Sequence, residues 1–268
     1  MNKKLISIDL DGTLLTPDYK LLPFSERVLK ELEKEGHIVL LSSGRPLRNI
    51  LPFYNQANLK GPLIAYNGAL ALYPNRDLSP IIKKKISYSF VNSIIKEFNP
   101  YLKNYLLELN DQTLYLKKEE TALQPYFPYS DKNLKNLCKT PLKEDIFIAV
   151  FECDPLKEEE LRKKIESDNR YLYRHWNKMP YCEIGIKDID KGEALKVVAK
   201  SLNFKQEDII AFGDGDNDAS MLAFAKNGFA IRNTRSALLR ERFSLTKKGN
   251  DDEGVAHTLN NLFNLKLS

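Results

Sequence analysis

The stretch DLDGTLL, residues 9–15, directly follows the apolar run LISI at residues 5–8. A continuous apolar run of this length predicts a buried strand. Two carboxylates, Asp9 and Asp11, therefore stand at the carboxyl end of that strand. Asp-Gly is an ordinary turn signal, so the stretch alone predicts either a polar turn or a cation-binding site.

The segments on either side of residues 83–187 alternate between strands and helices. The expected strands are residues 5–10, 37–44, 62–69, 208–214 and 229–232. The expected helices are residues 25–36 with Ser25 as the cap, 191–203, 217–225, 236–243, and one that starts at Gly254. Strands that are apolar on both faces and separated by helices form parallel sheets covered on both sides. We therefore expect an α/β core with a Rossmann-like parallel sheet, made of residues 1–82 and 188–268.

Residues 83–187 have a different character. Several segments alternate polar with apolar residues, as strands with one wet face do: 81–89, 105–111, 112–118, 144–154, 171–176 and 181–187. Asn110-Asp111 predicts a hairpin turn between two of them, and the charged segment 156–167 predicts a helix. This pattern predicts an α+β domain that is inserted into the core.

Composition excludes several classes of function. The chain has 268 residues, 43% of them hydrophobic and 29% charged, and a formal net charge of +5. These values are typical of a globular protein, and the short, scattered lysine runs match no nucleic-acid-binding motif. The three cysteines, Cys138, Cys153 and Cys182, lack the spacing of a zinc site or a disulfide framework. With no apolar segment of membrane-spanning length, we expect a cytoplasmic protein without nucleic-acid or membrane partners.

Four polar clusters follow four of the predicted core strands: DLD at 9–11, SSGR at 42–45, Asn67-Gly68, and GDGDND at 213–218. In an open parallel sheet such ends meet at one edge, where ligands bind. Several carboxylates at one edge repel each other unless a cation lies among them, and oxygen ligands favour Mg²⁺. An EF-hand calcium loop is excluded, because it needs glycine at its sixth position and glutamate at its twelfth. Those positions hold Leu14 and Lys20 from Asp9, and Ala219 and Ala225 from Asp214.

Taken together, DLDGTLL, SSGR, Lys191-Gly192 and GDGDND, in this order, resemble the four motifs of the haloacid-dehalogenase-like (HAD) phosphatases. The long insertion after YNGA at 66–69 is similar to the Cof-type branch of that superfamily, in which the inserted domain is a cap that determines substrate specificity. The resemblance covers nearly the whole chain.

This resemblance implies a role for each matching residue. Asp9 is the expected nucleophile, which forms an aspartyl-phosphate, and Asp11 the general acid and then the general base. The expected ligands of Mg²⁺ are the Asp9 carboxylate, the Asp11 backbone carbonyl and Asp214, with Asp218 as a further carboxylate. The expected phosphate-binding groups are Ser43, Lys191, Asn217 and the backbone at Leu10 and Gly44.

Simpler interpretations stand beside these roles. Ser43 alone could cap a helix, Lys191 alone could be a surface lysine, and Asn67 either makes a turn with Gly68 or contacts substrate. Asp216 is interpreted as a solvated turn residue. In the inserted domain, Arg174, His175 and Glu183 are the candidates for reading the substrate, although packing is the simpler role for His175 and Trp176.

The sequence thus predicts a Mg²⁺-dependent phosphatase that acts on small phosphorylated metabolites, such as sugar phosphates or similar phosphomonoesters. Two alternatives remain: a sugar phosphomutase of the same superfamily, and a non-catalytic phosphate-binding regulatory module. The presence of both Asp9 and Asp11 favours an enzyme. The physiological substrate and the oligomeric state are left open.

Overall fold

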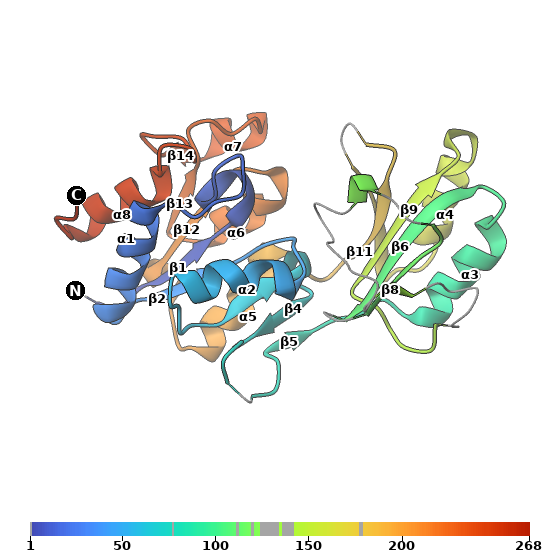
Figure 1. Cartoon of the computed structure of the whole chain (residues 1–268), viewed down its shortest axis with the longest axis horizontal. Coiled ribbons are helices and arrows are strands. Elements are labelled where there is room, and N and C mark those ends of the chain that lie inside the picture. The colour runs from blue at the N-terminus through green and yellow to red at the C-terminus, as the bar shows by residue number, and fades with distance from the viewer. Residues whose placement is uncertain are drawn as a thin grey trace. The chain divides into compact units, whose positions relative to one another are not determined.

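The computed structural model describes residues 2–76, 78–110, 113–118, 121–123, 134–135, 142–176 and 179–268. The chain forms two compact units. The first comprises Met1–Lys83 with Ile189–Ser268, and the second comprises Lys84–Asp188. Each boundary falls one residue later along the chain than the sequence pattern predicts. Figure 1 shows the elements of both units.

The first unit is built on a parallel sheet. Its strands are β1 (Leu5–Ile8), β2 (Ile38–Leu41), β12 (Ile209–Gly213), β13 (Asn227–Ala230) and β14 (Ser244–Leu245). Their order is β14-β13-β12-β1-β2, and every neighbouring pair is parallel. All four residues of β1 are buried, as expected for a strand covered on both faces. The predicted α/β core is confirmed, although β13 begins at Asn227, two residues before the expected strand at 229–232.

Helices cover this sheet. They are α1 (Pro23–Lys34), α2 (Leu47–Gln56), α5 (Lys191–Ser201), α6 (Ala219–Phe224), α7 (Ala237–Arg242) and α8 (Gly254–Phe263). Helices α1 and α8 lie side by side (Figure 1). Helix α2 contacts α1 through the Gln56 side chain, which donates to Oε2 of Glu26 over 2.9 Å, and α5 packs against α6. Helix α2 was not expected from the sequence pattern, which is interrupted by Pro52 inside the helix.

The prediction that Ser25 caps α1 is wrong. The helix begins at Pro23, and Leu22 is its N-cap residue. Proline is well suited to the first helical position because its missing N–H has no partner there anyway. Ser25 lies in the first turn, where its backbone N–H donates to Oε1 of Glu253 over 2.7 Å.

A smaller antiparallel sheet follows β2 in the first unit. Strand β3 (Leu63–Ala65) pairs with β4 (Leu70–Leu72), which pairs with β5 (Ile82–Lys83). Ser42 also forms a parallel bridge with Ile64. The predicted third strand thus lies beside the end of β2, while most of its pairing is antiparallel.

The second unit is an α+β unit. Its sheet has the order β10-β11-β9-β6-β7-β8. The bounds are β6 (Leu102–Asn110), β7 (Thr113–Leu116), β8 (Leu134–Lys135), β9 (Ile148–Cys153), β10 (Tyr171–His175) and β11 (Cys182–Ile186), with the helices α3 (Tyr88–Phe98) and α4 (Glu158–Glu166). The core of the unit contains residues of α3, α4 and the sheet, among them Ile94, Tyr105, Phe151 and Leu161.

Two details of this unit differ from the sequence analysis or lie beyond it. Residues 81–89 are not one strand, because α3 begins at Tyr88 and buries Val91, Ile94 and Phe98 at helical spacing. Strands β6 and β7 pair antiparallel as predicted, but Asp111 of the expected turn lies outside the described residues. In the described ranges, none of the helices is both long and apolar enough to cross a membrane.

Candidate active site

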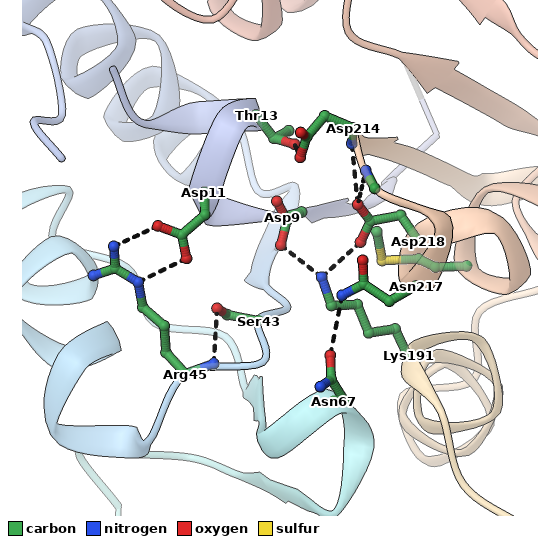
Figure 2. A network of polar contacts seen from close by, with 12 residues as sticks. Asp9, Asp11, Thr13, Ser43, Arg45, Asn67, Lys191, Asp214, Asn217 and Asp218 are labelled. Carbon is green, nitrogen blue, oxygen red and sulfur yellow. Dashed lines mark hydrogen bonds and ion pairs between the residues drawn. The ribbon is translucent and has the colours of Figure 1, made fainter. Parts of the chain in front are cut away.

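The register of the parallel sheet brings the predicted site residues to one edge. Ile8 of β1 pairs with Leu41 of β2 and with Phe212 of β12, so the three strands end side by side. The Asp9 N–H donates to the Phe212 carbonyl over 3.0 Å. The motifs that follow these strands therefore lie next to one another, as Figure 2 shows.

Three carboxylates meet there. Asp9, Asp214 and Asp218 each offer an oxygen, and these oxygens lie within 4.8 Å of one another. The Lys191 ammonium lies 2.6 Å from Oδ1 of Asp9 and 2.6 Å from Oδ1 of Asp218. Its side chain is only 1% exposed, so the interpretation of Lys191 as a surface lysine is wrong.

The electrostatics of this cluster call for a further cation. Burial and the neighbouring Asp218 raise the pKa of Asp9 well above its ordinary value, although Lys191 opposes the shift. Burial and Asp218 also raise the pKa of Asp214 to about 6. Burial alone would lower the pKa of Lys191, but the carboxylates of Asp218 and Asp9 raise it above the usual lysine value. One ammonium thus faces three carboxylates, which leaves negative charge unneutralised.

The donor set fits Mg²⁺, because it consists of hard oxygen ligands. Within this set Asp218 is also committed to the loop: its Oδ2 accepts the backbone N–H groups of Asp214 and Gly215, each over 3.0 Å. Asp9 and Asp214 are therefore the carboxylates better placed to bind a metal ion through an oxygen.

Gly12 and Thr13 fix Asp214 from the opposite side. The Thr13 hydroxyl donates to Oδ1 of Asp214 over 3.1 Å. Gly12 has a φ of +76°, and a Cβ atom there would overlap the Asp214 carboxylate. Only glycine fits both requirements. The contact of Thr13 was not expected, although this residue belongs to the motif DLDGTLL.

The Asp11 side chain is directed elsewhere. Its carboxylate is not among the three that converge, and it accepts two hydrogen bonds from the Arg45 guanidinium (Figure 2). The backbone turns at this point, since Gly12 has a positive φ directly after Asp11. The implied metal ligand from Asp11 is its backbone carbonyl, and this role needs no carboxylate in the cluster. No separate role was expected for Arg45, although it belongs to the motif SSGR.

Groups suited to bind a phosphoryl group line the same edge. The buried Ser43 hydroxyl oxygen accepts the Arg45 N–H over 3.1 Å. Ser43 does not cap α2, whose N-cap residue is Pro46. The Leu10 side chain is buried in the core, which leaves only its backbone for the site. Asn217 donates through Nδ2 to Oδ1 of Asn67 over 3.1 Å.

The turn at residues 66–68 connects several parts of the site. Asn67 has a φ of 52°, and its backbone N–H donates to the Ser43 carbonyl over 3.1 Å. A Cβ atom on Gly44 would lie 3.1 Å from the Asn67 amide, so this glycine leaves room for that side chain. Gly68 packs against the Asp190 carbonyl, and Asp190 caps the helix that carries Lys191.

In the second unit, the candidates for reading the substrate divide into two groups. Arg174 and Glu183 are partners across β10 and β11, and Nη1 of Arg174 lies 3.3 Å from Oε1 of Glu183. The Trp176 indole donates to Oε2 of Glu183 over 3.1 Å. His175 points to the other face of the strand, where its Nδ1 lies 3.0 Å from Oε1 of Glu158. The structure thus brings Arg174 and Glu183 together, but not His175.

Comparisons with known proteins show the family to which the chain is similar over nearly its whole length. The profile of a family described as haloacid dehalogenase-like hydrolase matches residues 6–259. The chain is 28% identical to the 5-amino-6-(5-phospho-D-ribitylamino)uracil phosphatase YitU of Bacillus subtilis (strain 168), over 97% of this chain and 98% of that protein. It is 27% identical to the phosphatase YwpJ of the same organism, over 97% and 99% of the two chains.

Solved structures show the same fold. The crystal structure of TM0651 from Thermotoga maritima superposes with a TM-score of 0.80 at 26% identity, covering 97% of both chains. A haloacid dehalogenase-like hydrolase from Bacteroides thetaiotaomicron gives a TM-score of 0.83 at 20% identity, covering 98% of this chain and 100% of that one. Both units of the chain are therefore covered by these likenesses.

Proposed function

Because the chain belongs to the haloacid dehalogenase-like hydrolase family and is, like its named relatives, a phosphatase, we propose that it is Mg²⁺-dependent and works through an aspartyl-phosphate on Asp9. Its proposed substrates are small phosphorylated metabolites. One observation carries this proposal: the buried Asp9 carboxylate lies against Lys191 within a cluster of three carboxylates at the carboxyl edge of a parallel sheet.

The proposed metal ligands are Asp9, Asp214 and the backbone carbonyl of Asp11, with Asp218 as a further carboxylate that shapes the loop. When bound there, Mg²⁺ would neutralise charge on the carboxylates and on the phosphoryl group. The raised pKa values of Asp9 and Asp214 support a cation at this position.

In the proposed first step, an oxygen of Asp9 attacks the phosphorus atom, and the bond from phosphorus to the leaving oxygen breaks. The Asp11 carboxylic acid gives its proton to that oxygen, so an alcohol leaves. Lys191, which contacts the same Asp9 carboxylate, orients the nucleophile and balances negative charge on the transferred group.

In the second step, water attacks the phosphorus of the aspartyl-phosphate. The Asp11 carboxylate takes a proton from this water, the bond between phosphorus and the Asp9 oxygen breaks, and inorganic phosphate forms. Ser43, Asn217 and the backbone N–H groups at Leu10 and Gly44 are the proposed donors to the phosphoryl oxygens. Positioning and charge neutralisation account for most of the catalysis in phosphoryl transfer.

The second unit is the proposed cap domain, which would determine substrate specificity. The site at the sheet edge binds groups that all phosphomonoesters share, so discrimination between metabolites requires other residues. We assign this role to three side chains that contact one another: Glu183 and its two hydrogen-bond donors, Arg174 and Trp176. The name of YitU makes its substrate, a phosphorylated ribitylaminouracil, a compound to test along with sugar phosphates.

The test is turnover of p-nitrophenyl phosphate by the purified protein with Mg²⁺, followed by a screen of phosphorylated metabolites at fixed Mg²⁺. We expect EDTA to abolish activity and Mg²⁺ to restore it. A matched Asp9→Asn variant should be folded and inactive. Binding of phosphate without turnover would instead indicate a regulatory module, and a strict requirement for a sugar bisphosphate would indicate a mutase.

A further inference from the structure

Arg45 binds both oxygens of the Asp11 carboxylate through two nitrogens on one edge of its guanidinium. Nε donates to Oδ2 of Asp11 over 2.7 Å, and Nη2 donates to Oδ1. Such a forked pair fixes the plane of the carboxylate as well as its position. The Arg45 side chain is 15% exposed and that of Asp11 is 42% exposed, so the supporting side chain is the more buried of the two.

Arg45 is itself held from several sides. The guanidinium carbon lies 5.1 Å from the ring centroid of Tyr19 and 5.6 Å from that of Phe53. Its backbone N–H donates to the Ser43 hydroxyl, and its carbonyl accepts the Tyr66 N–H, each over 3.1 Å. A guanidinium between two rings loses little freedom when it binds a carboxylate. These contacts therefore fix the Arg45 side chain in the position from which it binds Asp11.

Among the residues that the structure describes, Arg45 is the hydrogen-bond partner of the Asp11 carboxylate, so the position of this carboxylate depends on it. The neighbouring Asp9 is oriented by Lys191, and Asp214 by Thr13. A proton donor that is misplaced by a fraction of an ångström loses much of its effect. We propose that Arg45 is a positioning residue that acts only through Asp11, holding its carboxylate for the two proton transfers described above. This inference rests on the proposed function.

The two proton transfers predict a specific kinetic pattern. For an aryl phosphate, the leaving group needs little protonation, so kcat/KM, which reports phosphorylation of Asp9, does not depend on Asp11. Hydrolysis of the aspartyl-phosphate still needs the base and limits kcat. For an alkyl phosphate the leaving oxygen must be protonated, so both kcat and kcat/KM depend on Asp11.

The test compares Arg45→Gln with the wild-type enzyme on p-nitrophenyl phosphate and on an alkyl phosphate such as glycerol phosphate. For the aryl substrate we expect kcat to fall at least about tenfold, with kcat/KM within about threefold of wild type. For the alkyl substrate, kcat/KM should also fall at least about tenfold. Arg45→Lys, which keeps the charge but not the fork, should be intermediate.

A double variant shows whether Arg45 acts only through Asp11. Adding Arg45→Gln to Asp11→Asn should cause no further loss, because the partner is already disabled. The matched control is Arg76→Gln, which removes an exposed arginine that lies over the Tyr73 ring, and it should leave both substrates unaffected. If Arg45→Gln does not fold, Phe53→Leu should give the same pattern more weakly.

Other outcomes would overturn the proposal. An equal loss of kcat/KM on both substrates would mean that Arg45 binds the phosphoryl group. A further loss in the Asp11→Asn background would mean that it acts by another route. If the wild-type enzyme did not turn over either substrate with Mg²⁺, the proposed function itself would fail, and the role of Arg45 with it.

Discussion

The ammonium of Lys191 lies midway between two buried carboxylates, 2.6 Å from Oδ1 of Asp9 and 2.6 Å from Oδ1 of Asp218. This contact joins Asp9, directly after the first strand, to a lysine 182 positions later in the chain. The positive charge of Lys191 thus holds the proposed nucleophile, Asp9, next to the loop that contains Asp218.

Replacing this lysine should damage both stability and activity. Lys191→Met keeps the length of the side chain but leaves Asp9 and Asp218 buried without their cation. Removing one partner of a buried ion pair destabilises a protein by about 3–5 kcal/mol. The free energy of unfolding, measured in urea, should therefore fall by about this amount. Phosphatase activity should be lost. Lys200→Met, an exposed position on the same helix, is the control and should behave as wild type. An unchanged unfolding midpoint in Lys191→Met would contradict the role of this ion pair.

Metal binding should weaken in acid. The pKa of Asp214 is raised to about 6, so a proton competes with Mg²⁺ for this carboxylate below that pH. Affinity should fall at least about tenfold for each pH unit below 6, because the proton on Asp9, whose pKa is also raised, competes with Mg²⁺ as well, and binding there should release protons. Isothermal titration at pH 5.5 and 7.5, in buffers with different ionisation enthalpies, measures both quantities.

The metal-free protein should show the opposite trend in stability. A carboxyl group whose pKa is higher in the folded state binds its proton more tightly there, so its contribution to stability is lost as pH rises from about 4 through about 6. In Asp214→Asn this part of the pH dependence should disappear, together with most Mg²⁺ binding. An affinity for Mg²⁺ that is the same at both pH values would place the metal on other ligands.

Asn67 should matter for binding rather than for folding. Asn67→Gly keeps the positive φ of 52° but removes the amide that accepts the Asn217 hydrogen bond. We expect a folded enzyme with a several-fold higher KM for p-nitrophenyl phosphate, since a neutral hydrogen bond contributes about 1 kcal/mol. Asn203→Gly, another left-handed asparagine on the surface of the first unit, is the control. Equal KM values in the two variants would show that the Asn67 side chain does not contribute to substrate binding.

Glu183 should affect the choice of substrate. Glu183→Gln keeps the shape of the side chain but weakens its contacts with Arg174 and Trp176. The ranking of metabolites by kcat/KM should change, while hydrolysis of p-nitrophenyl phosphate stays near wild type. Arg174→Ala should behave similarly. His175→Ala should have a smaller effect, because His175 faces Glu158 on the other side of the strand. Glu166→Gln, on the exposed side of α4, is the control. Proportional losses on all substrates would show that Glu183 supports the fold.

The sequence predicts the α/β core well because its strands are continuous apolar runs, whose burial on both faces admits few other structures. It also predicts that Asp9, Ser43 and Asp214 lie together, since the ends of parallel strands share one edge, whereas Lys191 is expected there only from the family resemblance. It fails where local patterns conflict: Pro52 conceals α2, and the β-forming residues at the start of α3 suggest a strand.

Contacts between side chains far apart in sequence are the second class of features that the sequence does not reveal. No local pattern states that Arg45 binds Asp11 or that Thr13 binds Asp214, because both contacts depend on how two loops meet in space. The same holds for His175: strand alternation separates it from Arg174, but its partner Glu158 is known only from the folded unit.

The position of the phosphoryl group on the enzyme distinguishes a covalent mechanism on Asp9 from any other. The Asp11→Asn variant should hydrolyse its aspartyl-phosphate slowly, so the intermediate should accumulate when p-nitrophenyl phosphate and Mg²⁺ are added. Acid quenching, proteolysis and mass spectrometry then identify the modified residue. We expect one phosphoryl group on Asp9, and none in the double variant Asp9→Asn/Asp11→Asn. A phosphoryl group on another residue, or substantial turnover by Asp9→Asn without any phosphoenzyme, would contradict this mechanism.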